Sequence, residues 1–303
     1  MRLLTLRTVL VATDLTPTSD PALDAAGRLE KAAGATLHVV HVAPPSAEII
    51  AQEGRRSEYA HEVDAAIGRA GLSTGPQLVH ILHGDPPAAI ASLADRIGAD
   101  LIVLGGHREG TQLRPEQPVG STAYAVITRT ASPCLVIRRP LRLPLRRSLV
   151  AIDYSESARG ALLVALSWTS ALRSRTTDTG APALTVLHVD PGSRGNDSRM
   201  RATMDQELEL LRRDAGDWAG VDVQGVTQAG DHIAKAIAQF ATQQQVDLVV
   251  LGTRGLSAER QSELGSISSE VTRLLDVPVL LVPPAIWRNY SQDLNDVPEQ
   301  TVT

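Results

Sequence analysis

The chain has 303 residues, of which 43% are hydrophobic and 21% are charged. At about 150 residues per domain this length predicts two domains, and the composition is typical of a folded globular protein and excludes a disordered chain. With 29 basic and 34 acidic residues, the formal net charge of −5 gives no overall attraction to nucleic acid or to an anionic membrane. We therefore expect neither as the principal partner.

The sequence contains one cysteine, Cys134, which cannot form an internal disulfide. No segment approaches the roughly 18 consecutive apolar residues of a membrane-spanning helix. The first residues, MRLLTLRTVLVATD, are interrupted by Arg7 and are followed by no small-residue cleavage site, so they are more typical of a first strand than of a signal peptide. We expect a cytoplasmic location.

Apolar runs predict five strands in each half of the chain. In chain order they lie near 8–13, 37–42, 77–82, 101–104 and 134–138, and then near 148–152, 184–189, 221–227, 247–251 and 278–282. The runs alternate with longer segments of helical spacing, which is typical of βαβ units around a parallel sheet. The expected fold class is α/β, with two tandem, doubly wound, five-stranded parallel sheets of Rossmann-like type.

The two halves are copies of one another. Four segments recur in order: TVLVATDLT (8–16) as SLVAIDYSE (148–156), TLHVVHVAP (36–44) as LTVLHVDP (184–191), 84–106 as 230–253, and SPCLVIRRP (132–140) as VPVLLVPP (277–284). The proline-punctuated PLRLP (140–144) is expected to link the copies. We place the domains at 1–140 and 146–285, and we expect the polar, aperiodic residues 286–303 to form a tail.

A glycine-rich loop follows the fourth strand of the second copy. Its motif residues have the spacing G-2x-G-9x-G-S and are Gly252, Gly255, Gly265 and Ser266. Such a loop exposes backbone N–H groups in front of a helix N-terminus, so it predicts an anion site. Glycine is expected because a Cβ would hold phosphate oxygens away from the amides and would prevent positive φ angles. Ser266 and the amides of Ile267 and Ser268 are expected to contact phosphate, and Arg254 and Arg260 to add charge.

This loop resembles the nucleotide-binding motif of the universal stress protein family, G-2x-G-9x-G-S/T, and the resemblance covers nearly the whole chain twice. It implies a tandem universal stress protein with the adenine nucleotide α-hydrolase-like fold. It also implies that the halves pack as a pseudo-dimer about a pseudo-two-fold axis. The last strands, near 134–138 and 278–282, are the expected contact, since their pairing would protect two hydrophobic edges.

The resemblance also implies residues that face the adenosine. In nucleotide-binding members an aspartate ends the first strand and a valine ends the second, and Asp153 and Val189 stand at these positions. A carboxylate there can accept a hydrogen bond from an amino or ribose group, and a valine supplies an apolar wall. Ala151 and Ile152 are implied to make backbone contacts. The alternative for Asp153 is a helix N-terminal carboxylate with no ligand.

The first copy carries a degenerate version of the same set, namely Asp14, Val42, Gly105, Gly110, Gly120 and Ser121. Gly105 lies five positions before Gly110 instead of three, and Pro115 and Pro118 in this loop offer no N–H. We expect ATP or a related adenine nucleotide, with or without Mg²⁺, chiefly in the second copy. The first site is expected to be weakened or empty.

No set of Ser, His and acidic residues indicates a catalytic site, so we expect a non-enzyme that hydrolyses ATP slowly at most. Two histidine pairs, His38 with His41 and His80 with His83, do not predict a metal site, because strand residues three apart point to opposite faces. The expected function is a stress-response regulator whose nucleotide modulates binding to an unknown protein partner or a second copy of the chain.

Two alternatives remain open. One is a nucleotide-independent interaction or chaperone-like protein with structural glycine loops. The other is an enzyme of the wider adenine-nucleotide group, whose SGGxDS signature is absent here.

Overall fold

The computed structural model describes residues 5–43, 53–72, 78–106, 119–173, 183–191, 202–206, 208–209, 220–255 and 263–295. Ten strands form one sheet: β1 (Thr8–Ala12), β2 (Thr36–Ala43), β3 (Val79–His83), β4 (Leu101–Gly105), β5 (Cys134–Ile137), β6 (Arg147–Ala151), β7 (Ala183–Asp190), β8 (Asp222–Ala229), β9 (Leu248–Gly252) and β10 (Val279–Val282). Around them lie the helices α1 (Asp20–Ala33), α2 (Glu53–Arg69), α3 (Pro86–Ile97), α4 (Ser121–Arg129), α5 (Glu156–Ala171), α7 (Ile233–Gln243), α8 (Ser266–Leu274) and α9 (Ala285–Asn295).

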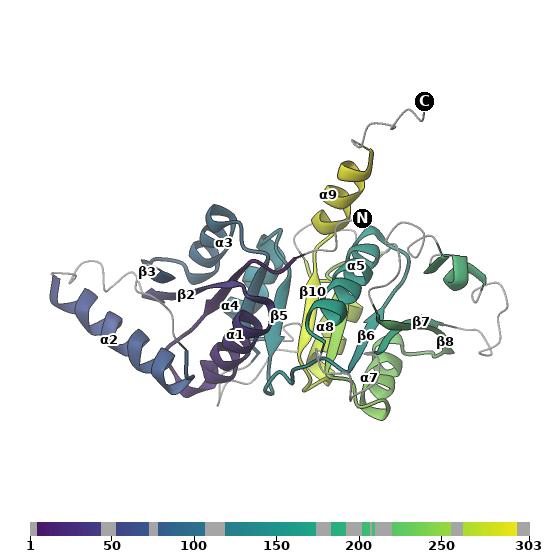
Figure 1. The fold of residues 1–303 in the computed structure, drawn as a ribbon, viewed down its shortest axis with the longest axis horizontal. Helices are drawn as coiled ribbons and strands as arrows, with labels where there is room; N and C mark the ends of the chain where they lie inside the picture. Colours follow the sequence, from purple (N-terminus) through teal and green to yellow (C-terminus); the bar gives the residue numbers. More distant parts are fainter. Residues whose placement is uncertain are drawn as a thin grey trace.

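The strand order is β3-β2-β1-β4-β5-β10-β9-β6-β7-β8 (Figure 1). Within each half all strands are parallel, and the first strand lies between the second and the fourth. The chain therefore winds outward in both directions from β1 and from β6, as a doubly wound fold requires. The expected fold class is confirmed, and every strand lies within about two residues of its expected position.

The halves join through β5 and β10, which pair antiparallel at the centre of the sheet. Leu135 and Leu280, which occupy the same position in the two repeats, are register partners, and both are fully buried. A pseudo-two-fold axis therefore passes between them, and the expected contact between the last strands is confirmed. Cys134 lies in the same junction, where burial raises the pKa of its thiol and keeps it protonated.

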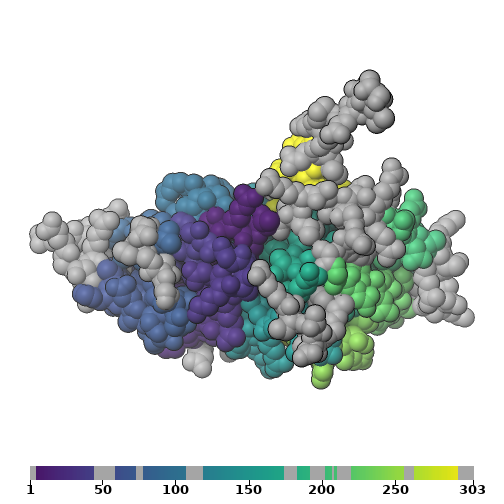
Figure 2. Space-filling model, in the orientation of Figure 1, coloured from purple at the N-terminus to yellow at the C-terminus, as the bar shows by residue number. Residues whose placement is uncertain are grey.

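Helices cover both faces of the sheet. The buried residues of α1, α2 and α5 form one apolar cluster with the sheet, and those of α3, α4, α7 and α8 form the other. Both clusters contain residues of both halves, so the two copies share a continuous core. Covered faces explain why the central strands are apolar rather than alternating. The edge strands β3 and β8 are only partly buried, and β8 is largely polar. Figure 2 shows the two halves side by side, purple to blue at the left and teal to green at the right.

The expectation that 286–303 is an aperiodic tail is wrong for its first part. Residues Ala285–Asn295 form α9, which contacts α5 and projects from the body of the molecule (Figure 1). Ile286, Trp287 and Tyr290 have the i, i+1, i+4 spacing of one helix face and are partly buried against the core. Gly160 makes the approach possible, because a Cβ there would lie 3.3 Å from the backbone nitrogen of Trp287.

Among the described residues, no helix is both long enough and apolar enough to span a bilayer.

Candidate functional site

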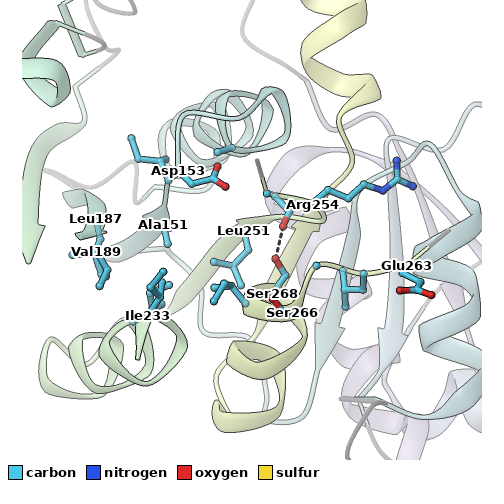
Figure 3. Close-up of a pocket in the computed structure, with 18 residues that line it drawn as sticks. Ala151, Asp153, Leu187, Val189, Ile233, Leu251, Arg254, Glu263, Ser266 and Ser268 are labelled. Carbon is cyan, nitrogen blue, oxygen red and sulfur yellow. Dashed lines mark hydrogen bonds between the residues drawn. The ribbon is translucent and has the colours of Figure 1, made fainter. Parts of the chain in front are cut away.

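A cavity of about 540 Å³ opens at the carboxyl ends of β6, β7 and β9 (Figure 3). This is the edge at which doubly wound sheets bind ligands, and the volume is within the usual range for small-molecule pockets. Of the twelve residues that the sequence places in a second-half site, one, Arg260, lies outside the described residues. The other eleven line this one cavity: Ala151, Ile152, Asp153, Val189, Gly252, Arg254, Gly255, Gly265, Ser266, Ile267 and Ser268. The fold thus gathers residues that are more than a hundred positions apart in the chain.

One side of the cavity is apolar. Leu187 and Val189 of β7 and Ile233 of α7 line it (Figure 3). Ile237 of α7 also lines it. The two isoleucines are one helical turn apart, so they present a single surface. Sequence reasoning missed Leu187, Ile233 and Ile237. Their helical and strand spacing marks them as inward-facing, but it does not tell which inward positions border a cavity.

Asp153 follows β6 and points toward the segment that carries Arg254 (Figure 3). One carboxylate oxygen accepts a hydrogen bond of 3.1 Å from the backbone N–H of Ser155. Ser155 is the N-cap of α5, and its hydroxyl accepts from the N–H of Ala158 at 3.2 Å. Asp153 is therefore not the helix cap that its position suggested. It stabilises the turn between β6 and α5 and also faces the cavity.

The residue after this aspartate has an unusual backbone conformation in both halves. Tyr154 has a φ of 64°, and Leu15, which follows Asp14, has a φ of 66°. Asp14 also accepts a hydrogen bond from the N–H two residues on, at 3.0 Å from Thr16. Left-handed conformations of such residues are energetically costly and concentrate at functional sites. The repeat therefore preserves a strained turn at the edge of both cavities.

The opposite side of the cavity is formed by the N-terminus of α8. Its N-cap, Gly265, has no side chain to occupy the N–H groups of the first turn. The hydroxyl of Ser268 donates to the carbonyl oxygen of Gly252 at 2.6 Å, which fixes the helix start against the end of β9 (Figure 3). First-turn N–H groups and the helix dipole together give a positive potential at this end of the cavity.

The motif glycines are required for close approach rather than for backbone conformation. None of Gly252, Gly255 and Gly265 has a positive φ, so that part of the expectation is wrong. A Cβ on Gly255 would lie 2.6 Å from a carboxylate oxygen of Asp153, and one on Gly265 would lie 3.3 Å from the carbonyl oxygen of Thr253. The loop thus packs directly on Asp153 and on the β9 end. Arg260 lies outside the described residues.

The first half has an equivalent but smaller cavity of about 340 Å³. It is lined by five of the six expected residues, namely Asp14, Val42, Gly105, Gly120 and Ser121. Gly110, Pro115 and Pro118 lie outside the described residues. The backbone around Gly105 is looser than around its counterpart Gly252, since the nearest atom to a Cβ there is the carbonyl oxygen of Thr18 at 3.8 Å.

The histidines form pairs that spacing along the chain did not reveal. His38 and His41 lie on opposite faces of β2, as expected, but His38 lies beside His80 of β3, with 2.9 Å between Nδ1 and Nε2. His41 is buried on the other face and bonds the carbonyl oxygen of Thr13 at 3.0 Å through Nδ1. Within the described ranges, no three or more His, Cys, Asp or Glu side chains gather as metal ligands.

Comparisons with known proteins agree with this architecture. The model of the universal stress protein family matches twice, over residues 5–138 and 144–283. A universal stress protein from Archaeoglobus fulgidus DSM 4304 superposes with a TM-score of 0.66 at 21% identity, over 92% of this chain and 97% of that one. A putative universal stress protein from Pseudomonas aeruginosa UCBPP-PA14 superposes with a TM-score of 0.59 at 14% identity, over 95% and 97%.

A third relative is similar in sequence over a shorter stretch. The "universal stress protein in QAH/OAS sulfhydrylase 3'region" of Thermus aquaticus is 38% identical over 77 residues. That match spans 25% of this chain and 56% of the relative, so little more than half of the relative's length is covered. The two family-model matches together span most of the sequence, one on each half of the sheet. The chain therefore belongs to the universal stress protein family and contains two tandem domains of that family.

Proposed function

We propose that the protein is a stress-response regulator that binds ATP or a related adenine nucleotide in its second half. The observation that supports this most directly is the cavity itself, where an apolar wall, a carboxylate and an uncapped helix N-terminus meet. The base would lie against Leu187, Val189 and Ile233. The phosphates would lie at the first turn of α8, where N–H groups and the helix dipole favour anions.

The polar groups of the cavity divide in a way that suits this orientation. Arg254 and Glu263 lie on the side opposite Leu187 and Val189 (Figure 3). The Arg254 guanidinium would bind the phosphates directly. The Glu263 carboxylate would bind them through a metal ion such as Mg²⁺. Asp153 lies between the two sides, within reach of a ribose hydroxyl or an adenine amino group. We propose binding rather than turnover.

Nucleotide binding would regulate a partner through the loop that begins at Gly252 and ends at Gly265. A ligand shifts a conformational equilibrium only by the difference in its affinity for the two states. The partner surface, on another protein or on a second copy of the chain, must therefore include this loop or a segment that contacts it. We place this activity in the cytoplasm and expect weak or no nucleotide binding in the smaller first cavity.

Nucleotide content and affinity test the proposal. We expect acid treatment of freshly purified protein to release adenine nucleotide, and calorimetry to give about one site per chain with micromolar affinity, about −8 kcal/mol. Gly265→Val should abolish binding, because a Cβ there would lie 3.3 Å from the carbonyl oxygen of Thr253 and the larger side chain would displace the loop that borders the phosphate site. The matched control is Gly120→Val, the same position in the first half, where a Cβ would meet no heavy atom within 4 Å. Absence of both bound nucleotide and titration heat would reject the proposal.

A further inference from the structure

An arginine of the first half binds the C-terminal end of α8 in the second half. Arg138 follows β5 and crosses the junction between the halves. Its Nη1 atom donates to the carbonyl oxygens of Arg273 and Leu275, at 3.1 and 3.2 Å. These carbonyls belong to the last turn and the C-cap of α8. The guanidinium is half-buried, and an arginine remains cationic in such a setting.

This helix is the one whose N-terminus borders the cavity. Helix C-termini carry a negative partial charge and unpaired carbonyl groups, and a cation placed there stabilises the helix. Arg138 supplies both a charge and two hydrogen bonds at that end. Because α8 has only nine residues, an interaction that holds its C-terminus also restrains the position of its first turn.

The interaction has no reciprocal counterpart at the equivalent positions. The repeat aligns Arg138 and Arg139 with Pro283 and Pro284, which cannot donate hydrogen bonds to the end of α4. The two-fold relation between the halves is therefore broken at this point. The first half holds the α8 helix of the second half through an arginine, while the corresponding position of the second half offers α4 no such group.

Gly106 makes room for this arginine. A Cβ on Gly106 would overlap the Cγ of Arg138, and it would lie 3.1 Å from the carbonyl oxygen of Ile137 and 3.2 Å from the Nε of Arg138. The N–H of Gly106 bonds the carbonyl oxygen of Ile137 at 2.8 Å, and its counterpart Thr253 makes the same bond to Val282 at 2.9 Å. The backbone is thus equivalent in the two halves, and the glycine differs only in leaving space for the side chain. The space needed by Arg138 therefore explains why the first half has a glycine at position 106.

We infer that Arg138 is a positioning residue for the phosphate end of the second cavity, so that the first half supports ligand binding in the second. This inference rests on the proposed nucleotide-binding function. It gives the first half a role that does not require a nucleotide of its own. Arg138 lies at the far end of α8 and acts through the helix, without touching the ligand.

Ligands with and without phosphate separate this role from a general effect on folding. We expect Arg138→Met to weaken ATP binding by about 3- to 10-fold, the range expected for a partly buried helix-end charge, and to leave adenosine affinity within about 2-fold. Arg138→Lys should restore much of the ATP affinity. Arg139→Met is the matched control, because Arg139 makes an exposed ion pair of 2.7 Å with Asp276 and does not bond the α8 carbonyls.

Gly106→Ala is a second variant that displaces Arg138 without removing it, and it should weaken ATP binding in the same direction. Hydrogen exchange of the ligand-free protein should become faster in the first turn of α8 in Arg138→Met and stay unchanged in α7. Unchanged ATP affinity in Arg138→Met, or equal losses for ATP and adenosine, would overturn the inference while the proposed function stands. If the wild-type chain binds neither ligand, the proposed function fails, and this role of Arg138 fails with it.

Discussion

Gly252 and Ser157 are in direct contact: a Cβ on Gly252 would lie 2.8 Å from the backbone carbon, Cβ and Oγ of Ser157. The hydroxyl of Ser157 donates to the carbonyl oxygen of Val282 at 2.9 Å, so the same side chain joins α5 to the end of β10. The first glycine of the motif therefore lets the N-terminus of α5 lie against the carboxyl ends of β9 and β10. Gly252 and Ala158, the residue after Ser157, both line the cavity.

Substitution of this glycine should therefore affect the fold as well as the site. Gly252→Ala forces a backbone atom of α5 to move, and overpacking of this kind costs roughly 1–3 kcal/mol of unfolding free energy. Gly105→Ala, at the equivalent position, should cost less than about 0.5 kcal/mol, since its nearest neighbour would be 3.8 Å away. Chemical denaturation of the two variants measures the difference. Equal losses of stability would show that close packing does not explain Gly252.

Asp153→Asn separates the two roles of this residue. The amide keeps an oxygen that can accept from the N–H of Ser155, so the turn and the stability should be preserved. It removes the negative charge that would accept a hydrogen bond from the ligand, and a hydrogen bond to a charged group contributes roughly 1.5–3 kcal/mol. We expect adenosine and ATP affinities to fall together by about 10-fold or more in calorimetry. Asp14→Asn is the control, and an equal loss in that variant would contradict the assignment of the main site to the second half.

The fold was predictable because the central strands, such as β4, β5, β9 and β10, are buried on both faces. Val, Leu and Ile runs that lack polar alternation indicate a covered parallel sheet without knowledge of tertiary contacts. The family resemblance then implied the pairing of β5 with β10, which buries two equivalent apolar edges. The cavity residues near the motif, such as Asp153 and Gly265, followed from the resemblance because they lie at strand ends and loops of fixed spacing.

Contacts between segments distant in the sequence were not predictable. His38 and His80 meet through the register of β2 on β3, which no local pattern encodes. The packing of α9 on α5 could not be predicted, because it depends on the space that Gly160 leaves for Trp287. The role of Arg138 likewise depends on where the end of α8 lies across the junction. In each case the sequence gives the residue type but not the residue that it contacts in the fold.

The His38–His80 pair predicts a pH dependence of stability. Burial lowers the pKa of His38, and burial together with the neighbouring His38 and Arg96 lowers the pKa of His80. A lowered pKa means that the unfolded state binds protons more readily, so stability is complete above the ordinary histidine value of about 6.5 and is lost as pH falls below it. Thermal unfolding between about pH 7 and pH 5 should show a smaller decrease for His80→Gln than for the wild-type chain.

Arg96→Gln provides an internal comparison for the same pair. It removes one of the charges that lower the pKa of His80 and leaves the hydrogen bond between the two rings in place. The acid-side loss of stability should therefore decrease partly in Arg96→Gln and more in His80→Gln. A slope identical to that of the wild-type chain in both variants would show that other groups cause the acid sensitivity.

The C-terminal helix should contribute to the stability of the second half. Trp287 packs on Gly160, the guanidinium of Arg159 lies 5.7 Å from its ring centroid, and Arg288 makes an exposed ion pair of 3.4 Å with Glu156. Trp287→Ala removes a large, partly buried aromatic surface, and we expect a loss of about 1–3 kcal/mol in chemical denaturation. Arg288→Ala should cost less than about 0.5 kcal/mol, because exposed ion pairs contribute little.

Substitution of an exposed polar residue on α9 is the matched control for Trp287→Ala. Asn289 is exposed beside Trp287, so Asn289→Ala should leave the denaturation midpoint nearly unchanged. The start of α5 is held by its own cap, Ser155, beside Asp153, and this cap does not depend on α9. Loosening of α9 should therefore affect the cavity only weakly. We expect the ATP affinity of Trp287→Ala to stay within about 2-fold of wild type, a difference of about 0.4 kcal/mol. A loss of affinity without a loss of stability would instead make α9 part of the ligand response.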